Sequence, residues 1–234
     1  MHWVEAYYYS SGEFGFPENI SNLLLILDEH EKTRLARFAF EHLKWTFVTA
    51  RWIAKTAVAE KVKCQPSEIV LHYNENGKPL LDTLFGIDIS ISHTDKGIAV
   101  ALSNASVGID LECHKRRGDP WRQAELYLNP YVANVLDGLE SDKQKEQGFS
   151  RYWTAMESFV KRKGSSIFQE KAQFGKTIDP MIKDGCYKSE SAHWYTQSVG
   201  ADAQLTLCTS ALDHTLRSYV FDGKDFQNSP IFAN

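Results

Sequence analysis

Hydrophobic and polar positions along the chain follow two periods, and these predict its elements. Alternation with a period of two occurs over residues 2–10, 87–92, 97–103 and 106–112, which is typical of strands. A helical spacing runs instead from Asp28 to about Val62, where more than thirty residues contain neither Gly nor Pro. Asp28 is placed to cap this helix. The first half of the chain therefore predicts a strand, a long helix and then several strands.

The second half repeats this mixture of helices and strands. Helical segments are predicted around Arg122–Glu140 and Gly148–Lys163, followed by a run of strands from residue 177 onward. This order predicts an α+β fold of two similar halves, each of roughly 100 residues. The expected division is an N-terminal half at 1–105, a C-terminal half at 106–222 and a flexible tail at 223–234.

Composition narrows the class of protein. The 234 residues are 43% hydrophobic with a formal net charge of -4, which argues against a general nucleic-acid or membrane binder. The four cysteines show no CxxC spacing, which favours neither a zinc site nor a disulfide framework. The longest aliphatic run, Leu23–Leu27, is too short to span a bilayer, and the N-terminus lacks the pattern of a secretory signal. We expect a soluble cytoplasmic protein.

The strand "SVGIDLECH" contains the first candidate for chemistry. Because side chains alternate along a strand, Asp110 and Glu112 share one face, about 6.6 Å apart along the chain. Two like charges on one face repel unless a cation lies between them, and Mg²⁺ prefers such oxygen ligands. Taken alone, an exposed pair on an edge strand is the more common explanation, so this pattern leaves both interpretations open.

Other candidates are equally weak when each stands alone. Glu157 and Lys161 form an i,i+4 pair on one helix face, which is also an ordinary surface pattern. His93 follows a strand, and Lys78 projects from a Gly-Lys-Pro turn. The helix after Asp28 begins with cations, which opposes the helix dipole and suggests an anionic partner. These cations are Lys32, Arg34 and Arg37.

Taken together, the order of these motifs is specific. A GKP turn, then SISH, then GIDLE, and then a W-x-x-x-E-S-x-x-x-K helix resembles the 4′-phosphopantetheinyl transferases. The chain is most similar to their long, monomeric, surfactin-synthetase-activating type. The resemblance covers about Lys32–Lys163. It implies a pseudo-dimer of two α+β halves with the active site in the cleft between them.

The resemblance also implies a reaction and a metal. Members of the family move the phosphopantetheine arm of coenzyme A onto a serine of an apo acyl or peptidyl carrier protein and release 3′,5′-ADP. Asp110, Glu112 and Glu157 would then be ligands of Mg²⁺, and Mn²⁺ would suit the same oxygens. Glu157 is expected to act as the base for the serine hydroxyl, and Lys161 to stabilise phosphate charge.

Coenzyme A is expected to contact residues from the N-terminal half, with His93 and an N-terminal helix cation at its 3′-phosphate. These residues are Arg34, Lys44, Lys78, Pro79, Ser92 and His93. The chain departs from the family pattern at three positions. Met156 replaces a common Lys, Val132 lies near an acidic position, and Leu43 stands where an Asp often occurs.

Two alternatives accompany this hypothesis. The departures could mark a catalytically impaired paralogue that only binds a carrier protein or coenzyme A. A Mg²⁺-dependent phosphohydrolase would also use an acidic cluster, but it would not explain the GKP and SISH motifs together. We expect neither a nucleic-acid nor a membrane partner.

Overall fold

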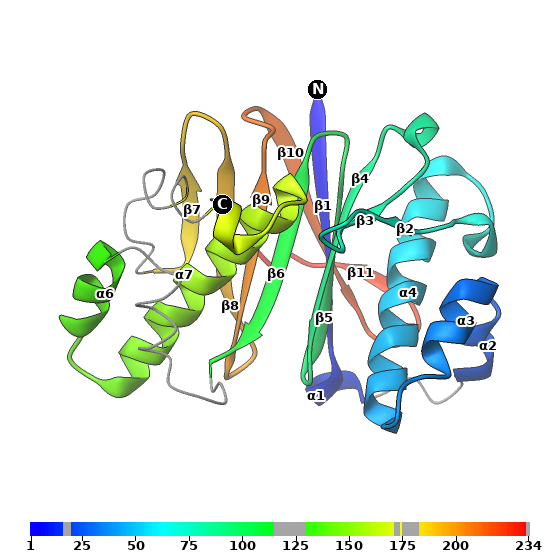
Figure 1. Cartoon of the computed structure of the whole chain (residues 1–234), viewed down its shortest axis with the longest axis horizontal. Helices are drawn as coiled ribbons and strands as arrows, with labels where there is room; N and C mark the ends of the chain where they lie inside the picture. Colours follow the sequence, from blue (N-terminus) through cyan, green and yellow to red (C-terminus); the bar gives the residue numbers. More distant parts are fainter. Residues whose placement is uncertain (16–19, 115–129, 171–173, 175–182, 233–234) are drawn as a thin grey trace.

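The computed structural model describes residues 1–15, 20–114, 130–170, 174 and 183–232 (Figure 1). The helices are α1 (Ser11–Phe14), α2 (Ile20–Leu24), α3 (Glu29–Leu35), α4 (Glu41–Val62), α6 (Pro130–Asp137) and α7 (Asp142–Lys163), with 3-10 turns η1 (Pro66–Glu68) and η2 (Thr83–Phe85). The strands are β1 (His2–Ser10), β2 (His72–Tyr73), β3 (Pro79–Leu80), β4 (Asp88–Thr94), β5 (Gly97–Ser103), β6 (Val107–Cys113), β7 (Gly185–Lys188), β8 (His193–Val199), β9 (Ala203–Thr209), β10 (His214–Phe221) and β11 (Phe226–Asn228). This mixture confirms the predicted α+β class.

The strands form two main sheets. One has five strands in the order β11-β10-β1-β5-β4, and the other has four in the order β6-β9-β8-β7. Strand β10 pairs in parallel with β1, so a strand from the end of the chain completes the first sheet. A division of the chain at residue 106 therefore does not separate the two sheets. Residues 214–221 (β10) follow that division in sequence but lie in the sheet of the N-terminal half.

Each sheet carries one long helix, and the two sheets pack against each other. Figure 1 shows α4 on one side of the molecule and α7 on the other, with β1, β5 and β6 between them. One buried cluster joins β1 and β5 to β6 and β9, through residues such as Val4, Ala101, Ile109 and Leu205. Further clusters lie under α4 and under α7. The layers are thus helix, sheet, sheet and helix.

The predicted helix over 28–62 is in fact two helices. Helix α3 begins at the predicted cap, because Asp28 accepts the Glu31 amide and the Glu31 side chain accepts the Asp28 amide. Helix α4 begins at Glu41, after five residues that leave helical structure. This break was missed because residues 36–40 contain no Gly or Pro to mark it.

Two more predictions need correction. The predicted flexible tail is partly ordered, because Phe226–Asn228 forms β11 against β10 and Phe232 is buried. Residues 233–234 lie outside the described part. Of the helix predicted at Arg122–Glu140, the structure describes Pro130–Asp137 as helix α6, and residues 122–129 lie outside the described part.

Side chains join the two halves where β4 runs beside β6. The amides of Val107, Ile109 and Leu111 donate to Asp88 (2.8 Å), Ser90 (3.0 Å) and Ser92 (3.2 Å), respectively. Short polar side chains of β4 thus replace the backbone acceptors that a strand would supply. We call this line of contacts the β4–β6 seam, and it places Ser92 beside Asp110.

Within the described residues, no helix has the length and apolar character needed to cross a membrane.

Candidate active site at the seam between the two halves

Asp110 is the best-defined residue of the candidate site. Its Oδ1 accepts hydrogen bonds from Ser92 (2.9 Å) and from the Lys161 ammonium (2.6 Å), and Lys161 also donates to Ser92 (2.9 Å). Three predicted site residues from β4, β6 and α7 therefore meet here. Asp110 is only 2% exposed, which corrects the expectation of an exposed strand carboxylate. Among the described residues, its Oδ2 is buried without a hydrogen-bond partner.

The two other predicted carboxylates lie on either side of the same interface. Glu112 follows Asp110 by two residues on β6, so it shares the face that packs against α7, and it is half-buried. Glu157 on α7 is also half-buried and lines a cavity of about 300 Å³. The cavity is lined from both halves, by Asn76, Gly77, Lys78, Pro79, Ser90 and Ile91 and by Glu157, Val160, Lys161, Gly164, Ser165, Ser166 and Ile167.

The GKP turn is held against the end of α7. Lys78 donates to Asp88 (2.6 Å) and to the carbonyls of Val107 (3.3 Å) and Arg162 (2.9 Å). Gly164 is the left-handed C-cap of α7. Its carbonyl accepts hydrogen bonds from the side-chain Nδ2 atoms of Asn74 (2.8 Å) and Asn76 (3.0 Å). Lys78 thus ties both halves together while its side chain lines the cavity, and Pro79 is buried beside it.

A second group of cations gathers beside His93. Partial desolvation and the positive charges of Lys161, Arg51 and Arg34 lower the pKa of His93, which favours its neutral form near neutral pH. The Arg34 and Arg51 guanidinium carbons lie 5.5 and 4.4 Å from the centre of the Phe47 ring. Arg34 and Arg51 face Tyr73 as well, at 5.9 and 5.7 Å. This arrangement suits an anionic ligand.

Arg51 was missed at the sequence level. It is held by a buried pair with Glu31 (Nε–Oε1 3.2 Å), and the fully buried Lys55 donates to the other oxygen of Glu31 at 2.6 Å. Glu31 thereby ties α3, which carries Arg34, to α4. The sequence did contain a signal for it. Arg51 lies four residues after Phe47 and four before Lys55, so all three share one face of a long helix.

The remaining predicted contact residue, Lys44, lies at the start of α4. It pairs with Glu41 at 2.6 Å across one helical turn. The three cations whose charges act on His93 are Lys161, Arg51 and Arg34. The structure therefore gives Arg34 a clearer position at the candidate site than Lys44.

The departures from the family pattern lie mainly in the core. Met156 is 0% exposed and Val132 is 7% exposed, and both belong to the cluster between α6, α7 and the four-stranded sheet. The side chain of Met156 thus packs away from the cavity that Glu157 and Lys161 line. Leu43 is half-buried near the start of α4.

The residues present suit a hard divalent cation in their chemistry. Carboxylate oxygens are the ligands that Mg²⁺ prefers, and the buried, unpartnered Oδ2 of Asp110 has the lone pairs to bind one. In the described part of the chain, however, no three His, Cys, Asp or Glu side chains are gathered closely enough to hold a metal ion. Asp110, Glu112 and Glu157 are therefore candidates for metal binding on the chemistry of their side chains.

Comparison with known families assigns both halves. Residues 16–105 match the model described as 4′-phosphopantetheinyl transferase, N-terminal, and residues 106–208 match the 4′-phosphopantetheinyl transferase superfamily. The two matches meet at residues 105 and 106, directly before β6 begins at Val107. The chain belongs to the 4′-phosphopantetheinyl transferase superfamily.

Relatives with this name come from several bacteria. The chain is 29% identical over 156 residues to 4′-phosphopantetheinyl transferase HetI of Nostoc sp., a match that covers 64% of this chain and 65% of HetI. It is 34% identical over 106 residues to the transferase gsp of Aneurinibacillus migulanus, covering 44% and 42% of the two chains. It is 32% identical over 123 residues to AcpT of Escherichia coli, covering 51% and 60%. Each match spans less than two thirds of the relative's length.

Proposed function

We propose that this protein transfers the 4′-phosphopantetheine arm of coenzyme A to a serine of an apo acyl or peptidyl carrier protein, with Mg²⁺, and releases 3′,5′-ADP. Family membership and the names of the relatives support the class of reaction. The observation that carries the proposal is Asp110, a buried carboxylate with one oxygen held by Ser92 and Lys161 and the other unpartnered. Such an oxygen is costly to bury unless a ligand binds it.

Coenzyme A is proposed to lie across the seam. The cations Arg34 and Arg51, with His93, would bind its 3′-phosphate, while Ser92, Lys78 and Pro79 would line the path of the pyrophosphate toward Lys161. A neutral His93 can donate one hydrogen bond to a phosphate oxygen without the cost of adding a further charge to this cationic region. Because both halves of one chain line the cavity, we also infer that the monomer is the active unit.

The transfer forms one bond and breaks one. The serine oxygen of the carrier attacks the β-phosphorus, which carries the pantetheine arm, and the bridging oxygen leaves with its electron pair as part of 3′,5′-ADP. Glu157, which lines the cavity, accepts the serine proton, and the Lys161 ammonium beside it stabilises charge on the phosphate oxygens. When bound by Asp110, Glu112 and Glu157, the metal would neutralise and orient the pyrophosphate.

The test is transfer itself. The protein is incubated with coenzyme A, MgCl₂ and an apo carrier protein, and mass spectrometry is used to look for the phosphopantetheine increment on the carrier. We expect the increment with wild-type protein, and a rate at least about 10²-fold lower for Asp110→Asn, since one element of charge stabilisation is removed. Asp95→Asn, an exposed carboxylate in the β4–β5 turn, is the matched control and should transfer at the wild-type rate.

Two other outcomes would replace the proposal. Binding of coenzyme A without any increment on several carriers would support a non-catalytic binding module. Release of phosphate from coenzyme A in the absence of carrier would support a phosphohydrolase. Met156 and Val132 pack in the core under α7, and neither lines the cavity, so neither side chain blocks the candidate site.

A further inference from the structure

Helix α7 is fixed on the four-stranded sheet at three levels. At the first, Gly108 lets the helix approach closely, since a Cβ there would overlap the backbone of Ser158 and Arg162. At the second, the Trp194 indole donates to the Ala155 carbonyl (3.2 Å). At the third, the hydroxyl oxygens of Thr154 and Thr206 are 2.7 Å apart. The third contact is a polar one within an otherwise close-packed interface.

This polar contact lies beside the candidate metal ligands. In the β6–β9 register, Asp110 is opposite Thr206 and Glu112 is opposite Gln204, so all four side chains face α7. The register of β9 with β8 adds Thr196 opposite Thr206 and Ser198 opposite Gln204. Two rows of polar residues therefore cross the sheet, and each row begins at one of the proposed ligands.

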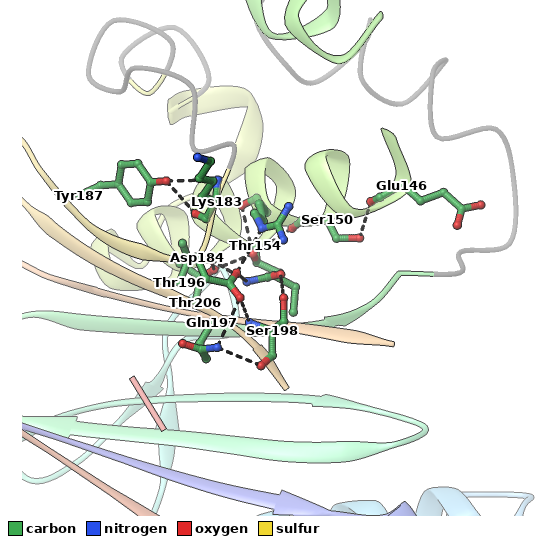
Figure 2. A network of polar contacts seen from close by, with 12 residues as sticks. Glu146, Ser150, Thr154, Lys183, Asp184, Tyr187, Thr196, Gln197, Ser198 and Thr206 are labelled. Atoms are coloured by element: carbon green, nitrogen blue, oxygen red, sulfur yellow. Dashed lines mark hydrogen bonds and ion pairs between the residues drawn. The ribbon is translucent and has the colours of Figure 1, made fainter. Parts of the chain in front are cut away.

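The β8 and β9 residues of these rows are joined into one hydrogen-bonded network, shown in Figure 2. Thr206 bonds to Thr196 (3.0 Å), and the Gln204 amide donates to Thr196 (2.8 Å) and to Asp184 (3.1 Å). Asp184 also accepts from the Ser198 amide (2.8 Å) and from Arg151 of α7 (3.2 Å). The network thus begins on α7 at Thr154, crosses the sheet and returns to α7 at Arg151.

Asp184 is ionised at neutral pH within this network. Burial alone would raise its pKa, but hydrogen bonds from the Ser198 backbone, the Gln204 amide and the Ser198 and Arg151 side chains hold the pKa below its usual range. A carboxylate can only accept hydrogen bonds, so it fixes the orientation of the Gln204 amide. At this end of the network, Asp184 therefore determines which groups donate and which accept the hydrogen bonds.

The burial of this network has a physical cost. Thr154, Thr206 and Gln204 are 0% exposed and Thr196 is 2% exposed. Polar groups are desolvated here for a small net gain, whereas apolar residues of the same shape would pack as stably. A directional contact, in contrast with an apolar one, is made in only one register of α7 on the sheet. Thr154 is three residues before Glu157 and seven before Lys161, so this register fixes both.

We propose that Thr154 and Thr206 are positioning residues that hold α7 in the register where Lys161 contacts Asp110 and Glu157 lines the cavity beside it. This inference rests on the proposed function, because its consequence is the affinity of the carboxylate site for Mg²⁺. The hydroxyls act through the helix and need not touch metal or substrate. Replacing both should loosen the site while leaving the fold intact.

The test compares Thr154→Val/Thr206→Val with Thr154→Ser/Thr206→Ser. Valine keeps the shape and removes both hydroxyls, whereas serine keeps the hydroxyls and removes the methyl groups. We expect the valine pair to bind Mg²⁺ in the coenzyme A complex about 10-fold more weakly by calorimetry without carrier, and to transfer about 10-fold more slowly. Its melting temperature should change by no more than about 4 °C. The serine pair should bind Mg²⁺ with the affinity of the wild type.

Thr209→Val is the matched control. Thr209 is buried on the same strand, but on the face away from α7, where its hydroxyl accepts the Ala211 amide (3.1 Å). This variant should lose stability while binding Mg²⁺ as the wild type does. If the valine pair unfolds, the single Thr154→Val variant serves instead, because Thr206 keeps its bond to Thr196.

The outcomes separate the inference from the function beneath it. Wild-type protein that neither binds Mg²⁺ with coenzyme A nor transfers would overturn both. Active wild-type protein, together with a folded valine variant of unchanged Mg²⁺ affinity and rate, would overturn the positioning role alone. The same would follow if the valine and serine pairs lost affinity equally.

Discussion

Arg34 and Arg51 approach the same two aromatic rings from different helices, and together they give the proposed 3′-phosphate site its charge. Arg34 is exposed on α3, whereas Arg51 is buried on α4 and paired with Glu31. Among the described residues Arg34 pairs with no carboxylate, so its guanidinium can bind a phosphate in a forked geometry. Arg34 is therefore the residue through which the 3′-phosphate should be tested.

Arg34→Ala should raise the KM for coenzyme A about 10-fold and leave kcat nearly unchanged, because a charged hydrogen bond far from the reacting atoms contributes to binding alone. Lys44→Ala, which breaks the pair with Glu41, should change KM by less than about twofold. Steady-state kinetics with both coenzyme A and 3′-dephospho-coenzyme A would measure this. The Arg34 effect should vanish with the dephospho substrate; an equal loss with both substrates would place Arg34 elsewhere.

For single residues, the sequence predicted which side chains form the candidate site better than it predicted their burial and contacts. Asp110, Ser92 and Lys161 were chosen from motifs and do meet within hydrogen-bond distance. Their burial could not be predicted, because it depends on α7 crossing β6 at Gly108, a contact between residues far apart in sequence. Arg51 was missed for a similar reason: its partners Glu31 and Tyr73 come from other elements.

Helix α7 and strand β6 form the element pair on which the candidate site depends. The strand presents Gly108, Asp110 and Glu112 on one face, and only the glycine has no side chain to separate the two backbones. The helix then lies low enough for Lys161 to reach Asp110 at 2.6 Å. Close approach at one residue thus positions the charged pair two residues further along the strand.

Gly108→Ala should displace α7 or prevent folding. The added methyl would meet backbone atoms of Ser158 and Arg162, which cannot rotate away as a side chain can. Overpacking of this kind costs about 1–3 kcal/mol or more, so we expect a fall in melting temperature of several degrees and the loss of transfer activity. Circular dichroism and the transfer assay would measure both.

Gly138→Ala is the matched control for this change. A Cβ at Gly138 would make only ordinary contacts, the nearest at 3.5 Å, so stability should change by less than about 0.5 kcal/mol. Equal melting temperatures for the Gly108 and Gly138 variants would contradict the close approach.

Elements with strong periodicity were predicted well, and short ones poorly. The capped start of α3 and the strands β4, β5 and β6 match their patterns, whereas α7 begins at Asp142, before the predicted start at Gly148. Residues 68–73 (EIVLHY) also have the composition of a strand, but only the two residues of β2 form one, because its pairing partner β3 is equally short. Pairing across the chain decides such cases, and a local pattern does not contain it.

Across the whole molecule, the two halves share more than a boundary. The central apolar cluster takes residues from both sheets, β10 returns to pair with β1, and the β4–β6 seam uses side chains of one half to satisfy amides of the other. None of these long-range contacts has a local sequence signal, so the extent to which the two predicted halves are joined could not be predicted. The physical consequence is that the halves should unfold as one unit.

Ser90→Ala tests this unity. Ser90 is 1% exposed and accepts the Ile109 amide at 3.0 Å, so alanine leaves a buried N–H without its acceptor and should cost about 1–3 kcal/mol. In a cooperative unit, amide hydrogen exchange followed by mass spectrometry should show protection falling by the same factor in peptides from α4 and from β9. Ser106→Ala, which removes an exposed hydroxyl bonded to Ser210, should leave both unchanged. Loss of protection in β9 alone would mean that the halves open separately. The seam would then be a hinge, and the proposed coenzyme A site along it would open and close with each separation of the halves.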